Sequence, residues 1–239
     1  MRSRRSTLLD RPVAPAVESA LSDLLDGSPP SEAEVLKEGS VYRVQDAVVK
    51  LYRGDRGFLS SLRPARALRT IRAYERVRPI PSPRPLSWRL PRHPEIESIL
   101  IYEFVRGTTL LQHQRDPDRA ARVALPRLFA DMFAARVLHG DVHAGNLLWD
   151  GETWWILDLD GIRGRLHALR RRRILEKLWG RLLFDLVDHE DARRIHAEFL
   201  ELAGCPWPTP ASWERILAWH REDLRQRALR GVSSPAYEP

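Results

Sequence analysis

The chain has 239 residues, of which 43% are hydrophobic and 30% are charged, a balance typical of a globular protein and not of a disordered chain. A formal net charge of +7 favours an anionic partner such as a nucleotide, a nucleic acid or an acidic membrane surface. The single cysteine, Cys205, excludes an internal disulfide and a paired-cysteine zinc site, and no apolar run suits a signal peptide or a transmembrane span. We therefore expect a cytoplasmic location, with any membrane contact peripheral.

Residues 1–33 are rich in Ser, Pro and Asp and hold one short apolar stretch, which predicts a flexible N-terminal tail with a short helix. Residues 34–53 contain short runs of Val, Tyr and Leu separated by the turn signals Gly39-Ser40 and Gln45-Asp46. This pattern predicts three short strands joined by tight turns.

Residues 58–78 place apolar side chains near helical spacing, which predicts an amphipathic helix with an arginine-rich outer face. The prolines between residues 79 and 85 then predict an extended connector. The apolar run SILIYEFV, residues 98–105, predicts a buried strand.

Helical patterns cover residues 118–137, 165–203 and 211–230. Because strands precede about residue 105 and helices follow it, we predict an α+β, two-lobed architecture. Its parts are a small β-rich N-lobe over residues 34–105 and a larger helical C-lobe over residues 106–239.

Two segments carry the strongest chemical signal: VLHGDVHAGNLLW, residues 137–149, and WWILDLDG, residues 154–161. The turn signal Asp150-Gly151 predicts a hairpin between them, joined by a two-residue turn. Such a hairpin brings Asp158 back toward the loop that carries Asp141 and Asn146. Two carboxylates and an amide in one small volume suit a hard divalent cation and a proton acceptor.

The run H-G-D-V-H-A-G-N resembles the H-R-D-L-x-x-x-N loop of protein kinases, and still more the HGD-type loop of small-molecule and atypical kinases. Asp158-Leu159-Asp160 resembles the metal-binding D-F-G segment, with aspartate in place of its glycine. More narrowly, residues 35–185 look like the bacterial lipopolysaccharide core kinase (Kdo/WaaP-like) family.

This resemblance implies a bilobal protein-kinase-like fold that uses ATP and Mg²⁺. It implies Asp141 as the catalytic base and Asn146 and Asp158 as metal ligands. We expect His139 to brace the loop by hydrogen bonds.

The resemblance also implies a nucleotide site in the N-lobe. Lys50 matches the lysine on the third strand that contacts the α- and β-phosphates, although a surface lysine is the alternative. The preceding turn has one glycine only, so we expect Gly39 and Ser40 to cover the phosphates. The backbone of the hinge, through Glu103 and Val105, is expected to bind adenine. Glu75, the only acid in residues 58–78, is the candidate ion-pair partner of Lys50, with Asp55 as the weaker candidate; because Glu75 comes late in the helix, the alternative is a solvated glutamate and no partner for Lys50.

The acceptor is expected to bind residues that follow the metal-binding segment. An arginine cluster there suits an anionic sugar or glycolipid, and no A-P-E motif of protein kinases follows. The alternative for these arginines is a solvated helix face. The predicted acceptor-binding residues are His143, Arg163, Arg171 and Arg172.

Two other functions are compatible with the same residues. One is a small atypical serine/threonine protein kinase of the RIO/Bud32-like kind, and the other is a pseudokinase that binds a ligand without turnover. Nucleic acid is not expected as a partner, because the eight tryptophans lie mostly in apolar runs.

Overall fold

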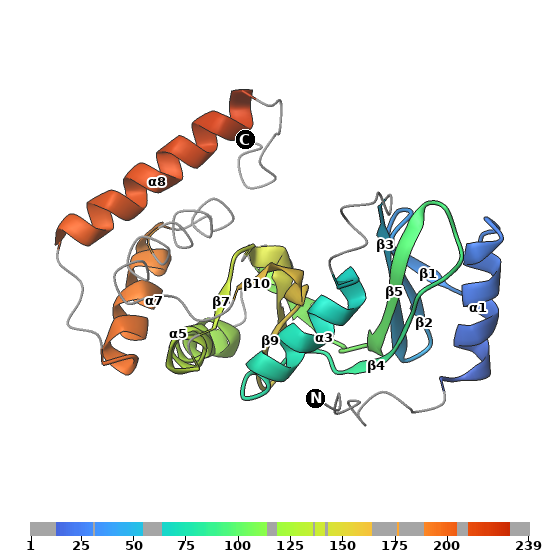
Figure 1. Cartoon of the computed structure of the whole chain (residues 1–239). Coiled ribbons are helices and arrows are strands. Elements are labelled where there is room, and N and C mark those ends of the chain that lie inside the picture. The colour runs from blue at the N-terminus through green and yellow to red at the C-terminus, as the bar shows by residue number, and fades with distance from the viewer. Residues whose placement is uncertain are drawn as a thin grey trace, which may run out of the picture. The chain divides into compact units, whose positions relative to one another are not determined.

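The computed structural model describes residues 13–30, 32–54, 64–113, 119–135, 137–141, 143–163, 176, 189–204 and 210–229. The chain divides into two compact units, which we call unit 1 (Met1–Glu75 and Pro83–Arg106) and unit 2 (Arg76–Ser82 and Gly107–Pro239). Unit 1 is built on an antiparallel sheet and unit 2 is mainly helical (Figure 1), which confirms the predicted α+β class.

Unit 1 contains a five-stranded sheet in the order β1-β2-β3-β5-β4. The three predicted strands are present and are joined by the two predicted turns: β1 (Glu34–Lys37), β2 (Val41–Val44) and β3 (Ala47–Arg53). The strand predicted over residues 98–105 is β5 (Ile96–Glu103), which pairs with β3 along its whole length.

One strand of this sheet was not predicted. β4 (Pro85–Arg89) begins at the last proline of the expected extended connector and pairs antiparallel with β5, over residues for which no strand was predicted. Proline lacks an N–H to donate, and Pro85 is tolerated because it is the first residue of a strand at the edge of the sheet.

Each face of the sheet is covered by a helix (Figure 1). On one face, α1 (Pro15–Leu25) packs its buried residues Val17, Ala20 and Leu21 against alternate residues of β3 and β5. On the other face, α3 (Arg66–Val77) packs Ala67 and Ile71 against Tyr52 and Leu100. The period-two alternation of β3 therefore serves two cores, one on each face.

The packing of α1 differs from the expectation of a flexible tail over residues 1–33. The short helix expected there is present, but its apolar face is buried in the unit 1 core and Glu18 pairs with Arg89 of β4 at 2.8 Å. The reason is amphipathicity: Val17, Ala20 and Leu21 lie on one side of the helix, so a sheet face can bury all three. Residues 1–12 lie outside the described residues.

Unit 2 begins with short elements and continues with longer helices. The described elements are β6 (Thr108–Thr109), α4 (Leu110–His113), α5 (Arg119–Ala134), β7 (Leu138–His139), the 3₁₀ helix η1 (Ala144–Asn146), β8 (Leu147–Trp149), β9 (Trp154–Ile156), the 3₁₀ helix η2 (Leu159–Gly161), β10 (Ile162–Arg163), α7 (His189–Leu202) and α8 (Pro210–Leu229). Of the helix predicted over residues 165–203, the described part is mainly α7.

The predicted hairpin is present, but its loop is longer than predicted. β8 and β9 pair antiparallel, with Trp149 opposite Trp154, so the loop is Asp150–Thr153 and not a two-residue turn. The carboxylate of Asp150 explains the difference, because its Oδ1 accepts hydrogen bonds from the N–H groups of Glu152 and Thr153, each at 2.8 Å. The side chain thus organises a loop of four residues.

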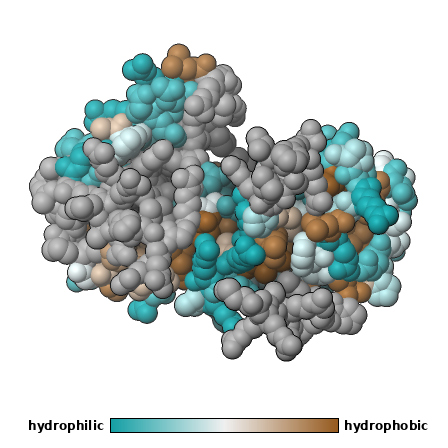
Figure 2. Space-filling model, viewed as in Figure 1, coloured by the Kyte–Doolittle hydropathy of each residue, from teal (hydrophilic) through white to brown (hydrophobic). Residues whose placement is uncertain are grey.

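The core of unit 2 is partly aromatic. Phe129 and Phe133 of α5 meet Phe199 of α7 edge to face, with ring centroids 6.5 Å and 6.1 Å apart. None of the described helices is long and apolar enough to cross a lipid bilayer. The described surface in Figure 2 mixes hydrophilic and hydrophobic residues, as is usual for a folded protein.

The packing of α1 yields a stability prediction. Leu21→Ala removes a side chain that is 5% exposed and should lower the free energy of unfolding of unit 1 by about 2–4 kcal/mol. Ser19→Ala, on the exposed side of the same helix, is the matched control and should change it by less than about 0.5 kcal/mol. Chemical denaturation followed by circular dichroism measures both variants. Equal free energies of unfolding for the two variants would mean that α1 does not contribute to the core of unit 1.

Candidate active site

The predicted site in unit 2 is formed by two segments that lie against each other. We call residues 139–146 the HGD loop and residues 158–160 the DLD segment. β7 leads into the HGD loop and pairs antiparallel with β10, which follows the DLD segment, with His139 opposite Ile162. At the other end of the loop, the N–H of Leu157 donates to the carbonyl of Asn146 at 2.8 Å.

His139 joins the two segments through its ring. Its Nδ1 accepts a hydrogen bond from the N–H of Asp141 at 3.2 Å, and its Nε2 lies 3.0 Å from the carbonyl of Leu157. Since a carbonyl can only accept, the ring must be neutral with its proton on Nε2. The side chain is fully buried, and the prediction that His139 braces the loop is confirmed.

Burial favours this neutral form. It is the largest influence on the pKa of His139 and lowers it below the ordinary value. The carbonyl of Leu157 and the carboxylates of Asp158 and Asp141 act in the opposite direction. Both carboxylates therefore lie close enough to the one ring to influence its charge, which places Asp141 and Asp158 on the same small region.

The side chain of Asn146 is oriented by the loop itself. Its Nδ2 donates to the carbonyl of Asp141 at 3.0 Å, so the amide N–H group is used within the loop. The amide oxygen Oδ1 then points the other way and can accept or coordinate. Oxygen is the donor atom that Mg²⁺ requires, so this orientation suits Asn146 as a ligand.

Asp158 has a left-handed backbone conformation, with φ 52° and ψ 66°, at the start of η2. Residues other than glycine adopt this region at a cost of order 1 kcal/mol or more, and such residues cluster at functional sites. The observation fits a residue whose carboxylate orientation is maintained despite the energetic cost of its backbone conformation. The carboxylate of Asp158 and the amide oxygen of Asn146 are both oxygen donors, the kind of ligand that a hard divalent cation takes.

No group of three or more His, Cys, Asp or Glu side chains that could hold a metal ion occurs among the described residues. The predicted metal ligands, Asn146 and Asp158, are only two residues, and one of them is an asparagine, so they would not be counted as such a cluster. Two protein oxygens are typical of magnesium sites in which substrate phosphates and water complete the coordination.

Gly161 is a site residue that was not predicted from the sequence motifs. Its carbonyl accepts from the N–H of Gly140 at 2.7 Å. A Cβ at this position would lie 3.1 Å from the ring of His139 and 3.2 Å from the nitrogen of Asp141. The glycine after the DLD segment is therefore what allows the HGD loop to approach so closely.

The structure describes two of the four predicted acceptor residues. His143 caps η1, with its Nδ1 accepting from the N–H of Gly145 at 3.1 Å. Arg163 lies in β10 opposite Leu138, beside the strand that leads into the HGD loop. Arg171 and Arg172 lie outside the described residues.

Unit 1 holds the predicted nucleotide residues. Gly39 and Ser40 lie in the turn between β1 and β2, where Gly39 has φ 65° and the N–H of Ser40 donates to the carbonyl of Lys37 at 3.1 Å. Lys50 lies on β3 opposite Val41, the first residue after this turn. Its ammonium nitrogen is 5.1 Å from the centroid of the Tyr52 ring, so it projects from the face of the sheet that α3 covers.

The direction of α3 brings its later turns toward Lys50. The helix starts at β5, where the N–H of Ala67 donates to Ser98 Oγ at 3.2 Å, and Ile71 packs in one cluster with Leu100. One further turn advances the helix by about 6 Å, to Glu75. Leu100 is the partner of Lys50 in the sheet, so α3 packs on the face of the sheet from which Lys50 projects. The weaker candidate partner, Asp55, lies outside the described residues.

The predicted hinge is tied into unit 1 by its first N–H groups. Glu103 donates from its N–H to the carbonyl of Arg84 at 3.0 Å, and Phe104 donates to the carbonyl of Asp46 at 2.9 Å. The carboxylate of Glu103 accepts from the N–H of Arg84 at 2.9 Å and is 3.5 Å from its guanidinium. The side chain of Glu103 is therefore structural, as expected, and Val105 is followed by Arg106, the last residue of the unit.

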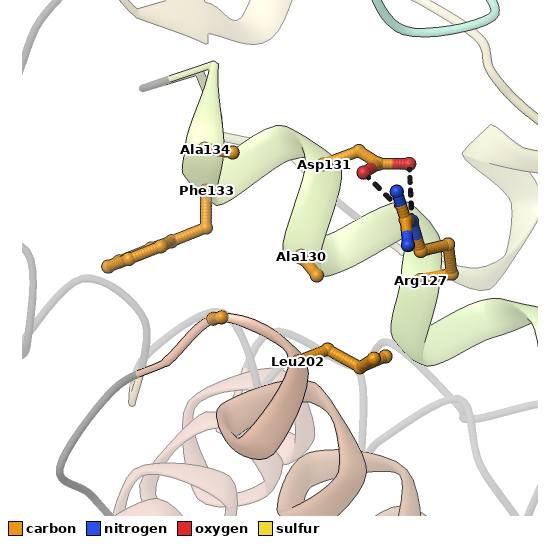
Figure 3. Close-up of a pocket in the computed structure, with 7 residues that line it drawn as sticks. Arg127, Ala130, Asp131, Phe133, Ala134 and Leu202 are labelled. Atoms are coloured by element: carbon orange, nitrogen blue, oxygen red, sulfur yellow. Dashed lines mark hydrogen bonds and ion pairs between the residues drawn. The ribbon is translucent and has the colours of Figure 1, made fainter.

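A cavity of about 360 Å³ lies elsewhere in unit 2, between α5 and α7 (Figure 3). Apolar side chains line it, including Phe133 and Leu202, and an ion pair of Arg127 with Asp131 lies at its rim at 3.0 Å. The predicted site residues that the structure describes are not among those that line this cavity, so it is separate from the HGD loop and the DLD segment.

The sequence matches the model of one protein family, described as the lipopolysaccharide kinase (Kdo/WaaP) family, over residues 31–202. A search of curated proteins finds no match. Among solved structures, the amicoumacin kinase hAmiN in complex with AMP-PNP, Ca²⁺ and Ami is similar with a TM-score of 0.58 at 11% identity, over 88% of this chain and 84% of that chain.

The aminoglycoside phosphotransferase APH(3'')-Id from Streptomyces rimosus is similar with a TM-score of 0.56 at 16% identity, over 86% of this chain and 97% of that chain. A 2.2 Å crystal structure of WbdD matches with a TM-score of 0.47 at 14% identity, over 76% of this chain, which spans about half (48%) of that chain. The first two similarities establish a fold shared with kinase-like phosphotransferases, whereas the third score is too low to support a conclusion.

The close approach at Gly161 yields a second prediction. Gly161→Ala should push the His139 ring and lower the free energy of unfolding of unit 2 by about 1–3 kcal/mol, because the buried ring has little room to move. Gly54→Ala is the control, since its Cβ would meet Glu97 at an ordinary 3.8 Å. Thermal unfolding measures both variants, and hydrogen exchange at the Asp141 amide locates the effect. An unchanged Gly161→Ala protein would mean that the loops are not packed as described.

Proposed function

The chain belongs to the lipopolysaccharide kinase (Kdo/WaaP) family, and on that premise we propose that it transfers the γ-phosphoryl group of ATP to a hydroxyl group on a sugar of an anionic, lipopolysaccharide-type glycolipid. The family match supports ATP-dependent phosphoryl transfer as the activity, and the two similar structures support the kinase-like fold that it requires. The acceptor, the roles of individual residues and a location at the inner face of the cytoplasmic membrane are the proposed parts.

The observation that carries the residue assignments is the hydrogen-bonded junction at His139. One neutral ring fixes the backbone at Asp141 and at Leu157, the residue before Asp158. In the proposed reaction the acceptor hydroxyl oxygen forms a bond to the γ-phosphorus, the bond from that phosphorus to the bridging oxygen of ADP breaks, and the hydroxyl proton passes to the carboxylate of Asp141.

Asn146 and Asp158 would hold Mg²⁺ with the oriented amide oxygen and the carboxylate described above. The ion supplies positive charge that neutralises the phosphate oxygens during transfer. The protein then contributes mainly by positioning ATP and the acceptor hydroxyl group, because phosphoryl transfer requires little covalent chemistry from protein side chains.

In unit 1, we assign Lys50 to the α- and β-phosphates and the turn with Gly39 and Ser40 to their cover. The N–H groups of Glu103 and Phe104 are used within the unit, so we assign adenine to the carbonyl of Glu103 and the N–H of Val105. Glu75 is the proposed ion-pair partner of Lys50, supported by the direction of α3.

The acceptor assignment rests on positive charge after the DLD segment. Arg163 is near the HGD loop through the pairing of β10 with β7, and we assign it, with Arg171 and Arg172, to an anionic group of the acceptor. His143 accepts from Gly145 through Nδ1, so its other ring nitrogen carries a proton that it can donate to the acceptor.

The test of the function is an assay with labelled ATP, Mg²⁺ and a fractionated extract of a Gram-negative cell. We expect label in the glycolipid fraction, and none with Asp141→Asn, whose transfer rate should fall by about 10²- to 10⁴-fold through loss of the base. Asp131→Asn, a surface aspartate of α5, is the control and should keep full activity.

The same assay separates the other functions. Label in protein would point instead to an atypical protein kinase, and absence of label with retained nucleotide binding would point to a pseudokinase. Equal rates for the wild type and Asp141→Asn would remove Asp141 from the role of base.

The proposed pair of Lys50 and Glu75 makes a separate prediction. Lys50→Met and Glu75→Gln should each slow transfer by about tenfold or more, on the order of one lost charged contact to phosphate. The double variant should be little slower than Lys50→Met, because the two side chains act together. Glu34→Gln, an exposed acid on β1, is the control. Steady-state kinetics of the single and double variants measure these rates. If the effects of the two single substitutions on the activation free energy add up in the double variant, the proposed pair is wrong.

A further inference from the structure

The turn proposed to cover the phosphates is held by a side chain. Arg53, the last residue of β3, donates from Nε to the carbonyl of Gly39 at 2.9 Å. Its Nη1 donates to Oε2 of Glu95 at 3.1 Å, in the segment that leads into β5. One guanidinium thus joins the β1–β2 turn to a second loop of the same unit.

The backbone around Arg53 reinforces this link. The N–H of Gly54 donates to the carbonyl of Glu95 at 3.2 Å, and the N–H of Glu95 donates to His93 Nδ1 at 3.1 Å. The backbone of Glu95 is therefore held by hydrogen bonds that do not involve the side chain of Arg53. A Cβ at Gly39 would lie 3.6 Å from Nη2 of Arg53, so the guanidinium lies directly against the glycine.

The energetics argue against a role in overall stability. The side chains of Arg53 and Glu95 are 54% and 69% exposed, and exposed ion pairs contribute only about 0–1 kcal/mol. An interaction of that size decides little about whether unit 1 folds. It is enough to bias the conformation of a short exposed turn, which is otherwise closed by hydrogen bonds from the N–H of Ser40 to the carbonyl of Lys37 and from the N–H of Leu51 to the carbonyl of Ser40.

We infer that Arg53 is a positioning residue of the nucleotide site, which holds the one-glycine turn at residues 38–40 in the conformation that receives the phosphates of ATP. The inference rests on the proposed function, because it requires that this turn covers the phosphates. Arg53 acts through the carbonyl of Gly39 and so contributes to binding of ATP, not to the transfer step.

The position of Arg53 fits this role. Arg53 follows Lys50 by three residues on the same strand, and the turn lies beside Lys50 through the pairing of Val41 with Lys50. The carboxylate of Glu95 at 3.1 Å offsets much of the guanidinium charge, so the hydrogen bonds of Arg53 matter more at the turn than its charge. Lysine could replace that charge but not the two-armed geometry, since it has no fork of N–H groups.

The experiment compares Arg53→Gln, Arg53→Lys and the wild type by kinetics and by amide hydrogen exchange. In Arg53→Gln, the KM for ATP should rise by about 5- to 10-fold, the loss of one modest hydrogen bond, with kcat changed by less than about twofold. Exchange at the Ser40 amide, which closes the turn onto Lys37, should be faster in the nucleotide-free variant. Arg53→Lys should resemble Arg53→Gln in this exchange.

Arg89→Gln is the matched control, because Arg89 forms a similarly exposed pair with Glu18 at 2.8 Å, outside the turn. It should leave both the KM for ATP and the Ser40 exchange unchanged. Full recovery of the KM in Arg53→Lys would reduce Arg53 to a source of charge and overturn the positioning role.

Thermal unfolding with AMP-PNP and Mg²⁺ separates the two levels of the proposal. If the wild type is not stabilised by the nucleotide, the proposed function and the role of Arg53 fail together. If the wild type is stabilised and Arg53→Gln matches it in KM and in Ser40 exchange, the role of Arg53 alone fails.

Discussion

A neutral histidine ring buried between two loops is the interaction on which the rest of the site depends. His139 accepts from one loop at Nδ1 and donates to the other at Nε2, so both backbones are fixed relative to one rigid plane. A protonated ring could not accept from Asp141, and burial opposes protonation by lowering the pKa. The histidine does no proton transfer in this scheme, because both of its nitrogens are committed to holding the loops.

The residue spacing predicted this site because each part of it is local in the sequence. The hairpin of β8 and β9 follows from two apolar runs around a turn, and once it forms, Asp158 must return toward the HGD loop. The loop length was misjudged because the Asp150-Gly151 signal does not reveal that the Asp150 carboxylate accepts hydrogen bonds from the N–H groups of Glu152 and Thr153. Gly161 was missed because a need for close approach leaves no pattern in neighbouring residues.

The features that the sequence did not reveal are those decided by tertiary packing. β4 is short and begins at a proline, so only its pairing with β5 identifies it as a strand. The first helix was expected to be part of a tail, because residues 1–33 are rich in Ser, Pro and Asp and hold only one short apolar stripe. The sheet face offered by β3 and β5 makes that stripe a core element, which residues 1–33 alone do not indicate.

Arginine takes over structural tasks at both turns of the β1–β2–β3 meander. Arg53 contacts the carbonyl of Gly39 and Glu95, and Arg43 contacts the carbonyl of Gln45 at 3.1 Å and Glu34 at 3.1 Å. In each case Nε meets a turn carbonyl and Nη1 meets a glutamate, which only a planar fork can do. An arginine-rich composition therefore has a geometric use in unit 1 beyond net charge.

The two left-handed residues other than glycine, among those that the structure describes, differ in what they reveal. Gln45 lies in a two-residue turn between paired strands, where the twist of the hairpin itself favours positive φ. Asp158 lies before a 3₁₀ helix, where no hairpin imposes this conformation and where asparagine or glycine would adopt it at less cost. Aspartate is one of the few residues other than glycine that adopt this region at modest cost, because its short polar side chain can hydrogen-bond locally, so the conformation is compatible with the metal-binding role proposed for Asp158.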